Sequence, residues 1–383
     1  MKISRRNFLK GSLITLFLSG YNFPVYSYSK KKNLVVIMLR GAMDGLTAVP
    51  IIGNNDFKKQ RKNLVLEKSL KLNSDFALNP RLINFYDLWK NGMGTVIHAT
   101  NIPYTKRSHF DGQNLMETGS RTPYAIKTGW LGRGMKLSNL ERNSLALSLP
   151  IPLLLRGVPK NDNYYPTKGK LPRKEILNIL KSVYSDRSEK DLVEILEIIQ
   201  KKSNNYSNYK LSTNNKILGY EAGKELAKID GPRVAVFEVN GFDTHVSQGG
   251  VDGTHSDCLD EIDKIIKSLK KGLGKQINNT LIVTLTEFGR SIKQNDALGT
   301  EHGYGTAILM AGGILKKKQV YTDWPGLKKK DLFEGRDLNS TIDSRSVYAS
   351  AMSAVFDIDF KLIKEKVFWG ENLENLSEKL FKV

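Results

Sequence analysis

A chain of 383 residues with 40% hydrophobic and 26% charged residues has the composition of a soluble globular protein, and it is long enough for one large α/β domain or two smaller ones. Its formal net charge of +20 at first suggests polyanion binding. The lysines, however, lie in short scattered runs without interleaved aromatic residues, so we expect no nucleic-acid binding. A lysine-rich composition, or peripheral association with an anionic envelope surface, accounts better for the charge.

The N-terminus has the features of an export signal. Residues 4–10 read SRRNFLK, a near-complete twin-arginine motif, and a short apolar run from Leu13 to Leu18 follows. That run is shorter than the roughly 20 residues of a transmembrane helix. We therefore expect residues 1–29 to be a signal peptide that is read by the twin-arginine translocase, which places the mature protein in the periplasm or outside the cell. Retention of this segment as an N-terminal anchor is the alternative.

Apolar runs alternate with amphipathic segments in the rest of the chain. We expect strands at residues 33–39, 95–98, 144–147, 153–155, 234–239, 280–286 and 306–310. We expect helices at residues 79–90, 108–117, 173–203, 213–229, 256–272 and 343–356. This alternation predicts a single α/β domain over residues 30–383, in which a mostly parallel central sheet has helices on both faces. The helices before residue 234 predict a helical insertion at about residues 171–230.

Potential metal ligands follow several of these strands. They are Asp44 after the first strand, Asp243 and His245 after residues 234–239, Glu287 after residues 280–286, and His302 in the next loop. The carboxyl ends of parallel strands meet at one edge of a sheet, so these side chains are expected to converge there. Carboxylate with imidazole suits zinc, manganese or iron, and a carboxylate-dominated site suits magnesium or calcium. The plainer alternative is that Asp243 caps a turn and His245 is an ordinary loop histidine.

Two further histidines are expected to be structural. His98 ends a short predicted strand, and His255 begins an amphipathic helix. Lone histidines in such places are more often buried and hydrogen-bonded than functional.

The segment Arg107-Ser108-His109-Phe110 precedes a predicted helix. Ser108 is either a simple N-cap or a nucleophile whose hydroxyl lies at the positive end of the helix dipole. No Gly-x-Ser-x-Gly elbow surrounds it, so a metal-activated nucleophile is favoured over a serine triad. Arg107 and His109 would add positive charge beside it.

Three arginines each follow a strand-like segment: Arg40, Arg156 and Arg290. Each is expected either to clamp an anionic substrate or to pair with a carboxylate.

Taken together, these motifs resemble a known family. The segments, in order, are Arg40-Gly41-x-x-Asp44-Gly45, Arg107-Ser108-His109-Phe110, Gly241-Phe242-Asp243-Thr244-His245, Thr286-Glu287-Phe288-Gly289-Arg290 and His302-Gly303. After a twin-arginine signal they resemble the domain-of-unknown-function 1501 family over nearly the whole mature chain. The Asp-Thr-His and Thr-Glu-Phe-Gly-Arg segments are the most specific.

That family is similar to the alkaline phosphatase and sulfatase superfamily, which implies an alkaline-phosphatase-like three-layer α/β fold. The resemblance implies a Ser108 nucleophile assisted by His109 and Arg290, with substrate binding by Arg40 and Arg107. It implies a divalent metal centre of one or two ions (zinc, manganese, magnesium or calcium), with the ligands Asp44, Asp243, His245, Glu287 and His302. Phe288 stands where the superfamily usually has a histidine. This leaves three alternatives open: a site with one metal, a site in which Arg290 replaces the charge of a second metal, and a fold that has lost catalysis.

The sequence thus predicts an exported metal-dependent hydrolase of phosphate or sulfate esters that acts on an anionic small molecule or glycan. The alternative is a non-catalytic envelope protein that binds an anionic glycan or supports secretion or surface assembly.

Overall fold

The computed structural model describes residues 31–66, 68–140, 144–147, 151–158, 162–163, 174–185, 193, 196–197 and 214–382. The expected signal peptide lies outside the described residues, as does much of the predicted helix at 173–203. Residues Lys32–Val383 cluster as one compact unit. In the part of the chain that is described, no helix combines the length and the apolar character that a membrane span requires.

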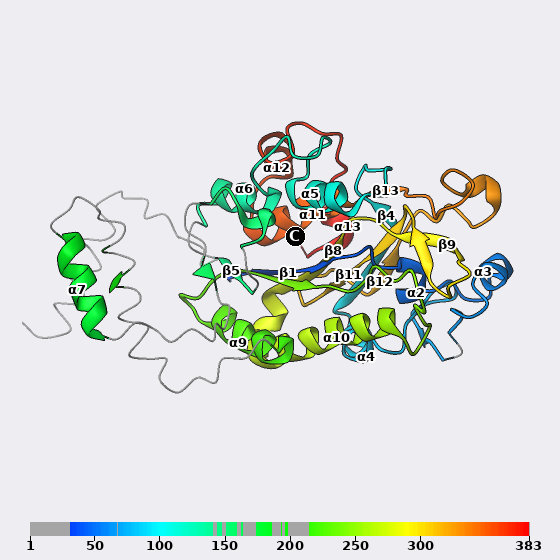
Figure 1. The fold of residues 1–383 in the computed structure, drawn as a ribbon, viewed down its shortest axis with the longest axis horizontal. Helices are drawn as coiled ribbons and strands as arrows, with labels where there is room; N and C mark the ends of the chain where they lie inside the picture. Colours follow the sequence, from blue (N-terminus) through cyan, green and yellow to red (C-terminus); the bar gives the residue numbers. More distant parts are fainter. Residues whose placement is uncertain are drawn as a thin grey trace, which may run out of the picture. The chain divides into compact units, whose positions relative to one another are not determined.

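A nine-stranded sheet lies at the centre of this unit, in the order β12-β4-β11-β8-β1-β7-β5-β6, with β13 beside β4 (Figure 1). Its strands are β1 (Asn33–Leu39), β4 (Gly94–Asn101), β5 (Ser144–Ala146), β6 (Asp162–Asn163), β7 (Val234–Val239), β8 (Thr280–Thr286), β11 (Thr306–Ala311), β12 (Gln319–Tyr321) and β13 (Ile342–Asp343). Among the described strands of this sheet, only β11 runs antiparallel to its neighbours. The mostly parallel sheet that the sequence predicts is confirmed.

Helices cover both faces of the sheet (Figure 1). On one face lie α5 (His109–Thr118), α6 (Trp130–Leu137), α11 (Ser344–Phe356), α12 (Phe360–Lys366) and α13 (Ser377–Leu380). On the other lie α4 (Ile83–Lys90), α9 (Asn215–Ala227) and α10 (Thr254–Leu273). The remaining described helices are α2 (Gly45–Ala48), α3 (Asn55–Gln60), α7 (Lys174–Ser185), η1 (Leu153–Leu155), η2 (Gly274–Asn279) and η3 (Lys329–Asp331).

The position of β1 at the centre of the sheet explains why its sequence is a continuous apolar run. Leu34 and Val36 pack into the core beneath α5 and α11, whereas Val35 and Ile37 pack into the core beneath α9 and α10. Successive side chains of a strand point to opposite faces, so a strand covered on both sides is apolar at every position.

One predicted strand is wrong, because residues 153–155 form the 3-10 helix η1. The backbone N–H of Leu155 donates to the carbonyl of Pro152 (3.1 Å), which closes a tight turn in place of a strand pairing. Leu154 and Leu155 are fully buried in this turn. An apolar run of three residues does not distinguish a buried turn from a buried strand.

The pairing register brings the ends of three strands together. Leu39 at the end of β1 is in register with Val239 of β7 on one side and with Thr286 of β8 on the other. The loops after these strands therefore begin at the same edge of the sheet. Near this edge lie the two-stranded sheet of β9 (Arg290–Gln294) and β10 (Thr300–His302), and a second small sheet pairs β2 (Leu70–Lys71) with β3 (Ala77–Leu78).

Candidate metal centre

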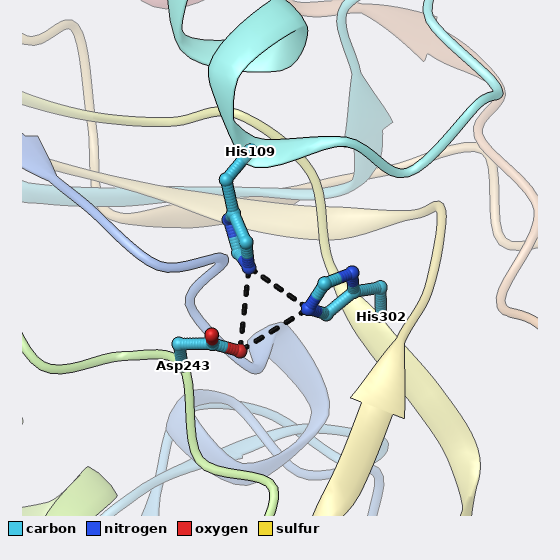
Figure 2. A group of neighbouring side chains, drawn as sticks. All are labelled: His109, Asp243 and His302. Carbon is cyan, nitrogen blue, oxygen red and sulfur yellow. Dashed lines mark hydrogen bonds and ion pairs between the residues drawn. The ribbon is translucent and has the colours of Figure 1, made fainter.

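Three histidines and one aspartate converge beyond this edge. His109 comes from the first turn of α5, Asp243 and His245 from the loop after β7, and His302 from the end of β10. The Nε2 atom of His302 lies 2.9 Å from Nε2 of His109 and 2.9 Å from Nε2 of His245. Figure 2 shows that His109, Asp243 and His302 point at one another from three separate segments.

Asp243 approaches the same point through a single oxygen. Its Oδ1 atom lies 3.3 Å from Nε2 of His109, 3.0 Å from Nε2 of His245 and 3.2 Å from Nε2 of His302. One ligand atom from each of His109, Asp243 and His302 forms a group whose members all lie within 4.8 Å of one another. Nitrogen and oxygen ligands at about 2.0–2.2 Å from a tetrahedral ion are themselves roughly 3.3 Å apart, so these separations fit one metal ion.

In each of the three imidazole rings, the group beside Nδ1 determines which nitrogen carries the lone pair. Each Nδ1 atom faces a group that accepts hydrogen bonds: Glu287 Oε1 for His109 (2.9 Å), Glu301 Oε2 for His245 (3.0 Å) and the backbone carbonyl of Arg107 for His302 (2.9 Å). A ring nitrogen beside such an acceptor carries the proton. In the neutral form of each ring, Nε2 then carries a lone pair that points toward the other residues of the cluster.

In the neutral tautomers set by these contacts, the three rings present lone pairs and no protons to one another. Neutral Nε2 atoms 2.9 Å apart place lone pair against lone pair. One proton can bridge His302 to either His109 or His245, but the single lone pair of His302 cannot accept from both. A divalent ion between the rings would accept the lone pairs of His109 and His302 at once, together with the oxygen of Asp243.

The charges around the cluster shift its protonation. Burial opposes protonation of His109, but the hydrogen bond and charge of Glu287 outweigh it, so the pKa of His109 is raised from its usual value. Burial and the neighbouring His109 lower the pKa of His302. Partial burial opposes ionisation of Asp243, but the hydrogen bond from Arg290 and the nearby His109 lower its pKa to about 2. The carboxylate of Asp243 is therefore ionised at neutral pH.

Glu287, a predicted metal ligand, lies behind the cluster. Its fully buried carboxylate accepts from Nδ1 of His109 (2.9 Å), the backbone N–H of Gly41 (2.9 Å) and Nε2 of Gln113 (3.0 Å), all at Oε1. The structure thus places Glu287 behind the His109 ring and not among the converging Nε2 atoms. From there it orients His109.

Asp44, also a predicted ligand, is engaged elsewhere. It is fully buried, and its Oδ2 atom accepts from Arg61 Nη1, Thr47 Oγ1 and Gln248 Nε2, each at 2.6 Å. Its other oxygen accepts from the backbone N–H of Leu46 (3.1 Å) at the start of α2. The structure does not bring the carboxylate of Asp44 into the histidine cluster.

Ser108 occupies the N-cap position of α5, as predicted, immediately before His109. Its side chain makes no capping hydrogen bond to the helix. The backbone N–H of Ser108 donates instead to the hydroxyl of Tyr104 (3.1 Å), which fixes the entry of the chain into α5. Ser108 is half-buried, and its hydroxyl is not used as the helix cap that the plainer interpretation of the sequence requires.

Two of the predicted substrate-binding or catalytic arginines pair with carboxylates outside the cluster. Arg40 binds Glu117 (3.0 Å) and Glu238 (2.6 Å), and its partners lie on α5 and β7. Arg107 binds Asp337 (2.7 Å) and contributes to the cluster through its backbone carbonyl.

Arg290 reaches the cluster directly. Its Nη1 atom donates to Oδ1 of Asp243 (2.7 Å), the same oxygen that faces the histidines. Its guanidinium is fully buried, and burial lowers its pKa although Asp243 opposes this shift. Arg290 therefore brings a fixed positive charge to the edge of the cluster.

Glu301 was not expected from the sequence. Its Oε2 atom lies 3.0 Å from Nδ1 of His245, which belongs to the loop after β7. In the sequence, Glu301 immediately precedes His302. The only sequence signal for Glu301 is that it is adjacent to His302. That Glu301 meets His245 depends on the fold, because the pairing of Thr300 in β10 with Gln294 in β9 sets the position of Glu301.

Residues 223–367 match the family DUF1501. The family is described as a protein of unknown function. The match contains Asp243, His245 and His302 of the cluster and the neighbouring Arg290, and it confirms, for this part of the chain, the family that the sequence motifs resemble. His109 precedes the matched DUF1501 region.

No curated protein matches the chain significantly. Solved structures similar to it include Ps i-CgsB in complex with k-i-k-neocarrahexaose, at 12% identity over 91% of this chain and 76% of that chain, with a TM-score of 0.44. The PsFucS1 sulfatase from Pseudoalteromonas sp. is 12% identical over 88% of this chain and 70% of that chain, with a TM-score of 0.40. A protein of the alkaline phosphatase superfamily from Vibrio parahaemolyticus is 10% identical over 91% and 72%, with a TM-score of 0.40.

Proposed function

We propose that this protein is an exported metal-dependent hydrolase of phosphate or sulfate esters, with one divalent ion held by His109, Asp243 and His302 and with His245 beside it. The observation that carries the proposal is the set of Nδ1 contacts, because they turn three Nε2 lone pairs toward Oδ1 of Asp243. A structural histidine needs no such convergence. An ion site requires it.

The donor set favours zinc among the divalent ions. Magnesium and calcium prefer oxygen ligands, whereas imidazole suits zinc and other late transition metals. The ligand atoms of His109, Asp243 and His302 lie 2.9–3.3 Å apart, which matches three positions of a four-coordinate ion and leaves the fourth for a hydroxyl or an ester oxygen. A single ion is favoured over two because Asp44 is neutralised by Arg61 (2.6 Å) and Glu287 accepts from His109.

Ser108 is the proposed nucleophile. It directly precedes the ligand His109 at the N-terminus of α5, where backbone N–H groups and the helix dipole stabilise negative charge. When bound, the ion would lower the pKa of a coordinated hydroxyl and neutralise charge on the ester oxygens. Arg290 supplies a further positive charge beside the ion, which suits a sulfate or phosphate ester of an anionic small molecule or glycan.

One observation favours the alternative, a non-catalytic envelope protein that binds an anionic glycan or supports secretion or surface assembly. Phe288 is fully buried and its ring packs against His109, with a centroid separation of 4.9 Å. An added Cβ on Gly112 would lie 3.1 Å from the Phe288 ring, so this ring fills the space between α5 and the end of β8. An apolar side chain at this position supplies no ligand for a second ion beside the cluster.

Hydrolysis assays distinguish the two functions. Protein purified without chelators and loaded with zinc is assayed on aryl phosphate and aryl sulfate esters, beside Ser108→Ala and the distant surface variant Lys275→Ala. The hydrolase proposal expects turnover by the wild type and by Lys275→Ala, and a loss of at least about 100-fold in Ser108→Ala. Zinc-loaded wild type without turnover on either ester class would favour the glycan-binding alternative. Full activity in Ser108→Ala would remove Ser108 from the mechanism.

A further inference from the structure

A buried polar chain leads from the interior of the protein to the metal cluster. It begins at Arg61 and Asp44, whose ion pair has side-chain exposures of 0% and 1%. It continues through Gln248 and Thr300, both fully buried, and ends at Arg290, which binds Asp243. These residues come from separate segments of the sequence, so only the folded chain joins them.

Gln248 is the central link, and its neighbours fix the orientation of its amide. Its Nε2 atom donates to the carboxylate of Asp44 (2.6 Å), which can only accept. Its Oε1 atom accepts from the hydroxyls of Thr244 (2.9 Å) and Thr300 (2.5 Å). The hydroxyl hydrogen of Thr300 is therefore committed to Gln248, and the oxygen of Thr300 is left as an acceptor.

Thr300 uses that acceptor to hold Arg290. Nε of Arg290 donates to Oγ1 of Thr300 (3.1 Å), and Nη2 donates to the Thr300 backbone carbonyl. The Nε and Nη2 edge of the guanidinium is thus occupied. Arg290 reaches Asp243 through Nη1 alone, at Oδ1 (2.7 Å).

We propose that Gln248 and Thr300 are positioning residues for the metal centre: by holding one edge of Arg290, they restrict it to a single hydrogen bond with Asp243 and keep that carboxylate available to the ion. This inference rests on the proposed metal centre. It also gives Asp44 a function without contact with the ion, because Asp44 sets the direction of the Gln248 amide.

The physical reason is the geometry that arginine prefers with carboxylates. A free guanidinium tends to bind a carboxylate through two parallel N–H groups. Asp243 is 45% exposed and has room to turn toward such a fork, whereas Arg290 is buried and needs partners for every N–H. If Thr300 or Gln248 loses its polar group, Arg290 is expected to pair with both oxygens of Asp243 and so compete with the ion.

The test measures the dissociation constant of Zn²⁺ by competition with a chelator, for Thr300→Val, Thr300→Ser and Gln248→Met. Thr300→Val and Gln248→Met keep the side-chain shape but lose the hydrogen bonds, and both should weaken zinc binding by about 10-fold or more. Thr300→Ser restores the hydroxyl and should bind zinc nearly as tightly as the wild type. The absorption spectrum of the Co²⁺-loaded protein should change in the two apolar variants and be restored in Thr300→Ser.

Asp263→Asn is the matched control for loss of stability. Asp263 is also buried, and it accepts from Asn84 and from the backbone of Phe85 between α10 and α4, away from the cluster. Thermal unfolding of the metal-free proteins measures the stability lost in each variant. Asp263→Asn should lose stability and keep its zinc affinity.

The two proposals fail in different ways. If the wild type binds no zinc, the metal centre itself is wrong. If the wild type binds zinc and Thr300→Val and Gln248→Met bind it as tightly, with an unchanged Co²⁺ spectrum, the positioning inference is overturned. Equal weakening in Asp263→Asn, or weak binding in Thr300→Ser, would also overturn it, because the effect would then follow stability and not the hydrogen bonds.

Discussion

Nδ1 of His109 lies 2.9 Å from Oε1 of the buried Glu287, and this contact determines which nitrogen of the ring faces Asp243 and His302. A carboxylate behind a histidine fixes its tautomer and raises its basicity as a ligand. The same relationship recurs at the rim of the cluster, where Glu301 holds His245. These two carboxylates differ in exposure, since Glu287 is buried and the Glu301 side chain is 53% exposed.

We predict that Glu287→Gln weakens zinc binding by about 10-fold, because an amide keeps the acceptor but removes the negative charge behind His109. Glu301→Gln is the matched variant at the exposed position, where solvent screens the lost charge. Its effect should be clearly smaller. Chelator competition measures both constants, and equal effects of the two substitutions would contradict the importance of the buried contact.

Asp44 and Asp243 are predicted to respond differently to loss of charge. Asp44→Asn leaves Arg61 buried without its carboxylate, so it should lower the free energy of unfolding by roughly 3–5 kcal/mol. At saturating zinc it should still bind one equivalent. Asp243→Asn should lose most of its zinc affinity with a smaller loss of stability. Denaturant unfolding and equilibrium dialysis measure the two quantities, and loss of zinc from folded Asp44→Asn would restore Asp44 as a ligand.

The buried histidines predict an acid-sensitive fold. Burial lowers the pKa values of His98 and His255 to about 4. The unfolded chain binds protons at these rings near the ordinary histidine pKa, so the folded state is disfavoured as pH falls from about 6.5 to about 4. Each ring contributes a slope of up to about 1.4 kcal/mol per pH unit in that window.

His98→Gln tests this pH dependence. His98 bonds the carbonyl of Val49 (3.0 Å) far inside the core, and glutamine keeps a donor there but does not titrate. The slope of unfolding free energy against pH between 4 and 6.5 should fall by up to about 1.4 kcal/mol per unit. An unchanged slope would mean that His98 is not neutral in the folded state.

The sequence predicts the sheet and much of the site for a local reason. Strands such as β1 and β8 are continuous apolar runs that end in polar residues, so both the strand and the position of its carboxyl end can be read from a few neighbouring residues. This is why Asp243, His245 and His302 are recognisable candidates before the fold is known.

The partners of these residues are not local. Whether Asp44 meets an ion or an arginine depends on Arg61, which reaches it from the end of α3 and also donates to the backbone of β9. That His109 points its Nε2 atom into the cluster depends on Glu287, 178 residues later. Strand periodicity and capping rules carry no information on such contacts between distant segments.

The most direct test of the proposed centre is equilibrium dialysis of the protein against Zn²⁺ near neutral pH, beside His302→Ala and His98→Gln. His302 contacts His109, His245 and Asp243, whereas His98 is a buried histidine away from the cluster. We predict one tightly bound zinc per chain in the wild type and in His98→Gln, and none in folded His302→Ala. A wild type without stoichiometric zinc, or a His302→Ala variant that binds it equally well, would contradict the metal centre.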